Sequence, residues 1–472
     1  MSLVTPVALV DPRELGPVHF IAIGGAGMSG VAALYADLGL AVTGSDRADS
    51  ANLEMLRGHG VRTYVGHDAH QLGEARTVVI SSAVKEDNPE LAEARRRGLR
   101  VWHRSAALAA LMLGRPGIAV AGTHGKTTTT AMIAHLLAGR GGGWVAGAPL
   151  ADGESSRLGE SGGPFVVEAD ESDGSFLQYP AATRVITYVE ADHLDNWGTP
   201  EAYAEGFRRF ASGDGGFGRS ASGDVAVVHI GDPGGRALAG QLGATPLVTY
   251  GTPEDADVSI GRIRHDGTGV RGEVTLDGRT VELALRVPGV HNLANATAAL
   301  IVAGRLGIDP AEAAAGLADF RGAHRRFETV GEVDGIRVVD DYAHHPTEIR
   351  AVLSAARDAA GEGRVIACFQ PHLYSRTRDF AEEFGQALAA ADQVILLDIY
   401  GAREQPIPGV TSALIDDVVS RIRGRDHVHP VHDLDGAVVA LAAVARPGDL
   451  VLTIGAGDVT AVGPRLLAAR FR

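Results

Sequence analysis

The sequence contains very few lysines and a single cysteine. Of its 43 basic residues only Lys85 and Lys126 are lysines, so a reaction step that needs a lysine amine has just these two candidates. Cys368, the one cysteine, cannot form a disulfide within the chain, and it cannot supply a cysteine-rich zinc site. Folds that depend on disulfides or on thiolate-bound zinc are therefore excluded.

The chain also lacks a long apolar run and an excess of basic charge. Its longest uninterrupted apolar stretch, residues 437–445, is about half a membrane span. The first residues have no basic lead and are interrupted by Asp11, Arg13 and Glu14, so a signal peptide is not expected. A formal net charge of -15 argues against a broad nucleic-acid-binding surface. We expect a soluble, cytoplasmic protein with no membrane insertion and no nucleic-acid partner.

The 472 residues suggest about three domains at about 150 residues per domain. Strand and helix patterns alternate over residues 1–113, which is typical of a parallel sheet covered by helices. The next block, 114–322, contains a period-two region at 256–288 that predicts antiparallel hairpins, and a Gly/Ser-rich surface loop at 211–224. A third alternating block covers 323–472. The prediction is an α/β protein with Rossmann-like first and last domains and a central nucleotide-binding domain.

A glycine-rich turn joins the first strand pattern to the first helix pattern. Gly25, Gly27 and Gly30 have the spacing of a dinucleotide-binding turn, and Asp46 ends the next strand. Such glycines let the backbone approach a diphosphate at a helix N-terminus, while the acid can bind a ribose. The pattern does not distinguish NAD from another nucleotide diphosphate, and a tight turn without a ligand is the alternative interpretation.

A second glycine-rich loop follows the strand GIAVAG and opens a long helix. It resembles a P-loop but is shorter, because Val120 stands where the first glycine is usual. Backbone N–H groups of such a loop hold phosphates, the lysine neutralises phosphate charge, and the next hydroxyl can hold Mg²⁺. The sequence predicts an ATP-binding loop of the central P-loop ATPase-type domain, made of Gly122, Thr123, His124, Gly125, Lys126, Thr127 and Thr128.

Acidic residues gather after two further strand patterns. Glu168 ends the strand FVVE and begins the run EADESD, and His193 follows the next strand in EADHLD. Sites of α/β proteins lie at these strand ends, and Mg²⁺ needs ligands besides the phosphates. We therefore expect Glu168 and His193 to bind the metal together with Thr127. The alternative is that several of these acids are solvated loop charges.

The third block carries two polar clusters, each after an apolar strand pattern. One contains Asp341, His344 and His345, and the other contains Arg376 and Arg378. Neighbouring histidines and planar arginine forks suit a site that binds a carboxylate and moves protons near neutral pH. Each histidine alone is more often structural than catalytic, but two such clusters at strand ends favour a site.

Nine motifs occur in the order in which the Mur ligases have them. They are GGAGMSG, AGTHGKTTTT, EADESDGSF, EADHLD, PGVHNLANA, HRRFE, DDYAHHPTEI, FQPHLYSRT and REQPIPGVTS. Together they cover essentially the whole chain, which therefore resembles that family. The resemblance implies an ATP-dependent ligase of cytoplasmic peptidoglycan precursor synthesis. GMSG, HHPTE and FQPHLYSRT resemble the branch that joins L-alanine to the carboxylate of UDP-N-acetylmuramate through an acyl phosphate.

The resemblance also implies roles for individual positions. The UDP-sugar site would comprise Gly25, Ala26, Gly27, Met28, Ser29, Gly30, Ser45, Asp46, Ser81 and Ser82. Further ATP contacts would come from His291, Asn292, Asn295, Arg326 and Asp341. From the residues alone, those on the helix after PGV could equally be helix caps. The amino-acid site would comprise His344, His345, Arg376 and Arg378. Thr127, Glu168 and His193 would bind Mg²⁺, and the catalytic residues would be Lys126, His345 and Arg376.

Two features depart from the family pattern. Tyr188 stands near a position where many such ligases have asparagine, and no lysine after Lys126 can form the carbamoylated metal bridge of sister branches.

Three other functions compete with an L-alanine ligase. An NAD-dependent dehydrogenase would explain the first loop only, and a regulatory ATP switch would need no amino-acid site. A recycling ligase would attach a ready-made peptide to the same sugar nucleotide. The oligomeric state is open.

Overall fold

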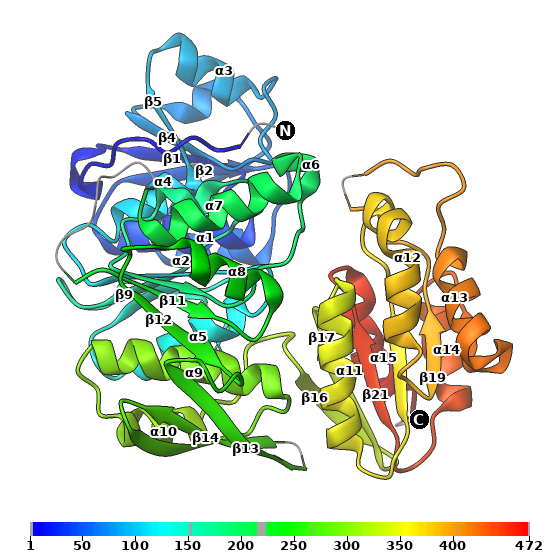
Figure 1. Cartoon of the computed structure of the whole chain (residues 1–472). Helices are drawn as coiled ribbons and strands as arrows, with labels where there is room; N and C mark the ends of the chain where they lie inside the picture. Colours follow the sequence, from blue (N-terminus) through cyan, green and yellow to red (C-terminus); the bar gives the residue numbers. More distant parts are fainter. Residues whose placement is uncertain (1–2, 151–152, 215–222, 268, 403, 471–472) are drawn as a thin grey trace. The chain divides into compact units, whose positions relative to one another are not determined.

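The computed structural model describes residues 3–150, 153–214, 223–267, 269–402 and 404–470. Much of the Gly/Ser-rich stretch lies outside these residues, so its prediction as a surface loop stays a prediction. Helices alternate with strands along most of the chain, and the strands form three sheets (Figure 1). Within the described ranges no helix has both the length and the apolar character needed to cross a membrane.

The first sheet has five parallel strands in the order β3-β2-β1-β4-β5. Because the order reverses next to β1, the carboxyl ends of β1 and β4 lie at the topological switch point of the sheet, which is where α/β proteins bind ligands. The predicted parallel sheet is thus confirmed. Its elements are β1 (Val18–Ile21), α1 (Ala26–Asp37), β2 (Val42–Asp46), α2 (Ala51–Gly58), β3 (Arg62–Val65), β4 (Thr77–Ile80), α3 (Pro89–Arg96), β5 (Arg100–His103) and α4 (Arg104–Ala110).

The second sheet has ten strands in the order β15-β14-β13-β12-β11-β10-β6-β9-β7-β8. Its strands are β6 (Gly117–Ala121), β7 (Gly143–Val145), β8 (Ser156–Arg157), β9 (Phe165–Glu168), β10 (Thr183–Ile186), β11 (Val225–His229), β12 (Leu247–Gly251), β13 (Val258–Asp266), β14 (Gly269–Leu276) and β15 (Arg279–Leu285). Its helices are α5 (Lys126–Leu137), α6 (Leu194–Trp197), α7 (Pro200–Ser212), α8 (Pro233–Gln241), α9 (Val290–Arg305) and α10 (Pro310–Ala318). The predicted hairpins are β13 to β15, and Asp277 and Gly278 both have positive φ in the tight turn between β14 and β15.

The third sheet has six strands in the order β16-β17-β21-β18-β19-β20, of which only β16 is antiparallel to its neighbour. The strands are β16 (Glu328–Val333), β17 (Ile336–Asp341), β18 (Val365–Phe369), β19 (Gln393–Leu396), β20 (Val428–Pro430) and β21 (Leu450–Ile454). The helices are α11 (Pro346–Ala360), α12 (Tyr374–Leu388), α13 (Ala413–Arg423), α14 (Leu434–Val444) and α15 (Val462–Arg470). Central strands such as β18 and β21 are buried along their whole length, which explains their continuous apolar sequences.

Helix α7 illustrates how the local sequence builds these elements. Thr199 caps its N-terminus by accepting a hydrogen bond from the Ala202 N–H, and Pro200 occupies the first turn. Phe207 and Phe210 lie on one face of the helix, and both rings pack on Phe176, with centroids 5.4 and 5.0 Å away. This packing ties the helix to the segment that follows the acidic run EADESD.

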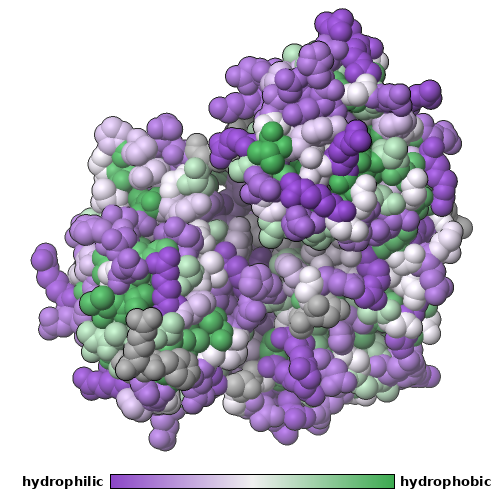
Figure 2. All heavy atoms as spheres, turned by 180° about the vertical axis from the view of Figure 1, so that it is seen from behind, coloured by the Kyte–Doolittle hydropathy of each residue, from purple (hydrophilic) through white to green (hydrophobic). Residues whose placement is uncertain are grey.

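The described residues form two compact units. The first contains the first sheet and most of the second. The second contains the third sheet, together with residues 262–273 and 282–293. The domain boundaries expected near 113 and 323 stay predictions. Hydrophilic side chains predominate on the face drawn in Figure 2, as expected for a chain in which 21% of residues are charged.

Candidate functional site

The first glycine turn leads from β1 into α1. Helix α1 begins at Ala26 after Gly25, which has no side chain to cap it, so first-turn N–H groups are left for another acceptor. The N–H of Gly24 donates to Asp46 Oδ2 over 2.8 Å. The predicted ribose-binding acid therefore also holds the turn in place. An uncapped helix N-terminus beside a glycine turn is suited to an anion such as a diphosphate.

Not all side chains predicted for the UDP-sugar site are accessible. Met28, Ser29 and Ser45 are almost completely buried, and Met28 belongs to the hydrophobic core. Ser45 Oγ donates to Glu90 Oε2 over 2.6 Å. A ligand could therefore meet these residues through their backbone only, whereas Gly25 itself is exposed.

Ser81 and Ser82 follow β4 at the carboxyl edge of the first sheet. Ser82 Oγ donates to Asp173 Oδ2 over 2.6 Å, and Asp173 is the last acid of the EADESD run. His103, at the end of β5, lies 3.8 Å from the same carboxylate. Within the first unit, the predicted sugar-nucleotide residues thus adjoin the acidic run that follows β9.

The second glycine loop has the geometry of a phosphate loop. Gly122 and Gly125 have φ of 138° and 83°, values that favour glycine. A Cβ at Gly125 would also lie only 2.7 Å from Asn295 Oδ1. Thr123 Oγ1 donates to the Glu190 carbonyl, and α5 then begins at Lys126. Both glycines are required by backbone conformation, and the loop ends at a helix N-terminus that favours phosphate.

Lys126 and Glu171 form a buried ion pair. Nζ of Lys126 lies 2.8 Å from Glu171 Oε1 and donates to the Gly122 carbonyl over 2.6 Å. Burial alone would lower the pKa of Lys126, but the charges of Glu171, Asp170 and Glu168 outweigh it and raise that pKa above its usual value. The Lys126 side chain is therefore a permanent cation in the loop. Glu171 is 1% exposed, so it is not the solvated loop charge that the sequence allowed.

Thr127 and Glu168 meet at the start of α5. The Thr127 hydroxyl donates to Glu168 Oε1 over 3.1 Å, and Glu168 Oε2 accepts from the Gly147 N–H over 2.9 Å. A hydroxyl and a carboxylate are oxygen donors of the kind Mg²⁺ prefers, so this pair fits the predicted metal site. His193 has φ of 52° and stands before α6 with 29% of its side chain exposed. Its part in metal binding stays a prediction.

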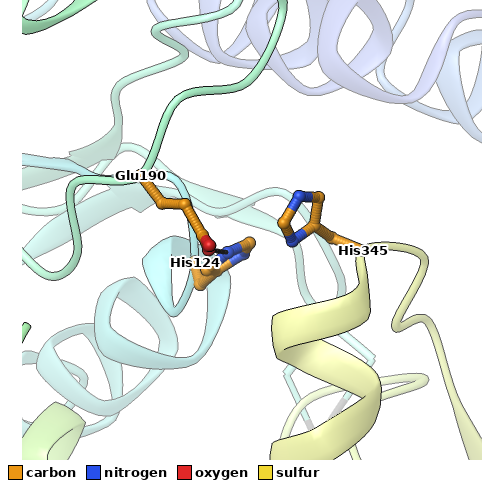
Figure 3. A group of neighbouring side chains, drawn as sticks. All are labelled: His124, Glu190 and His345. Atoms are coloured by element: carbon orange, nitrogen blue, oxygen red, sulfur yellow. Dashed lines mark hydrogen bonds and ion pairs between the residues drawn. The ribbon is translucent and has the colours of Figure 1, made fainter. Parts of the chain in front are cut away.

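His124 of the phosphate loop is paired with a second acid. Its Nε2 lies 3.0 Å from Glu190 Oε2. Figure 3 shows the two side chains facing each other, joined by a dashed line. Tyr188, which departs from the family pattern, packs against the His124 ring at a centroid distance of 5.3 Å, and its carbonyl accepts from the Thr123 N–H. The tyrosine therefore supports the loop through packing and a backbone hydrogen bond.

Helix α9 carries three of the predicted ATP contacts. Asn295 accepts a hydrogen bond from Thr129 Oγ1 over 3.1 Å and is thus tied to the helix of the phosphate loop. Asn292 donates to the Pro288 carbonyl over 2.7 Å and thereby holds the segment before the helix. His291 is exposed at the start of the helix. The roles of His291, Asn292 and Asn295 stay predictions.

In the second unit, Asp341 ends β17 and is buried. Its carboxylate accepts from the N–H groups of Ala343 and Phe327 over 2.7 and 2.8 Å. Burial raises the pKa of Asp341 to about 6, although Arg326 opposes the rise. The Arg326 guanidinium lies 5.3 Å from the centre of the Tyr342 ring. Arg326 and Asp341 belong to different motifs, and they lie close enough for the arginine charge to affect the pKa of the carboxyl group.

The histidine pair after β17 is held by α11. His345 is buried and caps the helix by accepting from the Thr347 N–H. Figure 3 shows its side chain at the start of α11. His344 lies 6.1 Å from His372, ring centre to ring centre. Burial lowers the pKa of His344 to about 3, with Arg376 adding to the effect and Glu348 opposing it. Both rings are therefore positioned firmly, and His344 is neutral at physiological pH.

The structure separates Arg376 from Arg378. Arg376 is 8% exposed, whereas 54% of the Arg378 side chain is exposed and its guanidinium binds Asp379. Both lie on α12, where residues two positions apart do not face each other. Arg378 is therefore exposed and paired with Asp379 in this structure, and its part in the amino-acid site stays a prediction.

Three residues outside the predicted set stand at the sites. Glu171 binds Lys126, His372 packs against Tyr400 beside His344, and Arg104 lies at the first glycine turn. Glu171 lies in the motif EADESDGSF and His372 in the motif FQPHLYSRT, so their place in these motifs could have indicated them from the sequence. Arg104 stands outside every motif, and its position depends on how α4 packs against α1.

Three family models match the chain. They describe the Mur ligase family catalytic domain at residues 17–116, the Mur ligase middle domain at 164–303 and the Mur ligase glutamate ligase domain at 325–457. A protein of Cutibacterium acnes named UDP-N-acetylmuramate–L-alanine ligase is 56% identical, over 99% of this chain and 98% of its own length.

Two solved structures are also similar. The UDP-N-acetylmuramate-alanine ligase of Thermotoga maritima superposes with a TM-score of 0.79 at 29% identity, covering 96% of this chain and 98% of that one. A murein peptide ligase of Psychrobacter arcticus has a TM-score of 0.69 at 26% identity, with the same coverage. The three-domain architecture and the high identity over the full length agree, and the chain belongs to the Mur ligase family.

Proposed function

We propose that this chain joins L-alanine to the carboxylate of UDP-N-acetylmuramate, with hydrolysis of ATP to ADP and phosphate, in cytoplasmic peptidoglycan precursor synthesis. The observation that carries the ATP-dependent step is the phosphate loop, in which Lys126 and Thr127 begin α5 beside Glu171 and Glu168. The choice of substrates is supported by 56% identity to a relative named for this reaction.

The reaction begins with transfer of the γ-phosphoryl group of ATP to the sugar nucleotide carboxylate, which gives an acyl phosphate and ADP. Backbone N–H groups of residues 122–127 bind the phosphates, and the Lys126 ammonium neutralises the charge that develops on the transferred group. Thr127 and Glu168 would hold Mg²⁺, which when bound screens the negative charge of the phosphates.

The amine of L-alanine then attacks the acyl carbon, and phosphate leaves from the tetrahedral intermediate. In the second unit, Arg376 can bind the alanine carboxylate through a bidentate pair. His344 is held neutral by burial, so it adds no positive charge beside Arg376, while His345 is fixed by its capping role. Asp341 and Arg326 would bind the nucleotide ribose and phosphate.

Phosphate release tests the proposal. Enzyme, ATP, Mg²⁺ and UDP-N-acetylmuramate are incubated with L-alanine, glycine, L-serine or a tripeptide, each in turn. The proposal expects the highest kcat/KM with L-alanine. Turnover with the tripeptide alone would instead identify a recycling ligase like the murein peptide ligase with which this fold superposes.

A further inference from the structure

The loop after β19 carries the motif REQPIPGVTS, and the acid of this motif reaches the start of helix α12. The carboxylate of Glu404 accepts two hydrogen bonds from Ser375, one from the backbone N–H over 2.9 Å and one from the hydroxyl. Ser375 is the second residue of α12 and stands 29 positions before Glu404 in the chain. A residue of a distant loop therefore provides the hydrogen-bond acceptor for the first turn of this helix.

The residue before α12 cannot provide that acceptor itself. Leu373 occupies the capping position, but its side chain is apolar and caps no N–H group. Its φ of 71° is a conformation that leucine rarely adopts, so the surrounding structure must impose it. The Leu373 N–H donates to the Tyr400 carbonyl over 3.0 Å, and the Tyr400 N–H donates to the Pro371 carbonyl over 2.8 Å. The loop after β19 thus fixes both the entry into α12 and its first turn.

Arg376 directly follows Ser375 in this first turn and is almost completely buried. The helix dipole disfavours a cation in the first turn of a helix and favours a carboxylate there. Glu404 therefore offsets the unfavourable position of Arg376 and also holds the backbone that carries it. Both charges act on His372, because Arg376 lowers the pKa of that ring and Glu404 opposes the lowering. The two charged groups thus lie close to the same histidine.

We propose that Glu404 is a positioning residue for the amino-acid substrate. By capping α12 from the loop, its carboxylate holds Arg376 in the orientation in which the guanidinium binds the carboxylate of L-alanine through a bidentate pair. This inference rests on the proposed function, because it takes L-alanine as the substrate and Arg376 as the ligand of its carboxylate. There are two competing interpretations. Glu404 would contact the amino acid directly, or it would only stabilise the fold.

Steady-state turnover of the full chain with L-alanine and with L-alaninamide distinguishes these interpretations. The two amines share a side chain and differ in the carboxylate that Arg376 would bind. We expect wild type to prefer L-alanine. Glu404→Ala should lower kcat/KM for L-alanine about 10- to 100-fold, mainly through KM, and should hardly change the value for L-alaninamide. Glu404→Gln should lose less, because its amide oxygen can still accept one hydrogen bond. The matched control is Glu383→Ala, which changes an exposed acid of the same helix and should keep the wild-type preference.

A double-mutant cycle with Ser375 decides how Glu404 acts. Ser375→Ala removes the hydroxyl donor, so it should lower the preference for L-alanine in the same direction but by less. Glu404→Ala/Ser375→Ala should be no worse than Glu404→Ala alone, since both changes break one interaction. Additive losses would indicate a direct contact between Glu404 and the substrate and would overturn the inference.

An equal loss of kcat/KM for both amines would also overturn the inference, because it indicates a structural role only. A wild-type KM for ATP shows that the variants are folded. Absence of L-alanine turnover in wild type would instead overturn the proposed function, and this inference with it.

Discussion

Replacing Lys126 by alanine should affect stability and catalysis for two separable reasons. The ammonium is the hydrogen-bonded partner of Glu171, whose carboxylate is 1% exposed and whose Oε2 has no hydrogen-bond partner among the described residues. Removing one partner of a buried ion pair costs about 3–5 kcal/mol, because an uncompensated charge is left behind. Lys126 itself is 16% exposed, so we expect a value near the lower end. Loss of the cation should also reduce turnover by about 100- to 1,000-fold or more.

The double variant Lys126→Ala/Glu171→Gln separates these effects. It removes both charges, so it should recover most of the stability while staying inactive. Urea unfolding measures stability, and phosphate release measures turnover. The matched control is Lys85→Ala, which changes the only other lysine, an exposed residue, and should leave both properties near wild type.

Two results would refute this reasoning. If Lys126→Ala unfolds at the wild-type urea concentration, the buried pair contributes nothing. If the double variant regains turnover, the ammonium is not required for phosphoryl transfer. The single variant should also lose less stability at pH 5 than at pH 8, because burial already raises the pKa of Glu171 and a proton can replace the missing cation.

Three further perturbations test other parts of the structure. Gly125→Ala should raise the KM for ATP and cost about 1–3 kcal/mol, because φ is 83° and the new Cβ meets a side-chain oxygen; Gly139→Ala, which has open space, should be neutral in the same assays. Glu168→Gln should shift the Mg²⁺ dependence of turnover to about 10-fold higher concentration or more, and an unchanged dependence would exclude Glu168 as a ligand. Between pH 7 and pH 5, the free energy of unfolding of wild type should fall by about 2 kcal/mol more than that of His344→Asn. Burial lowers the pKa of folded His344 to about 3, whereas the unfolded side chain binds a proton below about pH 6.5. The contribution of His344 to the free energy of unfolding is therefore full above about pH 6.5 and is lost as the pH falls below it. The 91% exposed His432, changed to Asn, should follow wild type in urea unfolding at each pH.

The strands, the helices and both glycine loops could be predicted from the sequence because each depends on local chemistry. Gly122 and Gly125 adopt backbone angles that other residues rarely adopt, and the Asp-Gly turn after β14 requires positive φ at both positions. The exposure of individual side chains in the predicted amino-acid site could not be predicted. Arg376 and Arg378 stand in one motif, but residues two positions apart on a helix point in different directions, so Arg376 is buried and Arg378 is exposed.

The sequence alone determined the alternation of elements, the phosphate loop and the resemblance to the Mur ligases, since these follow from spacing along the chain. Only the tertiary structure decided which charges are buried and with which partner. Glu171 stands 45 positions from Lys126, and Arg104 reaches Gly27 through the packing of two helices. Such pairings depend on which distant residues bury a side chain after folding, and the neighbouring residues in the sequence do not determine this.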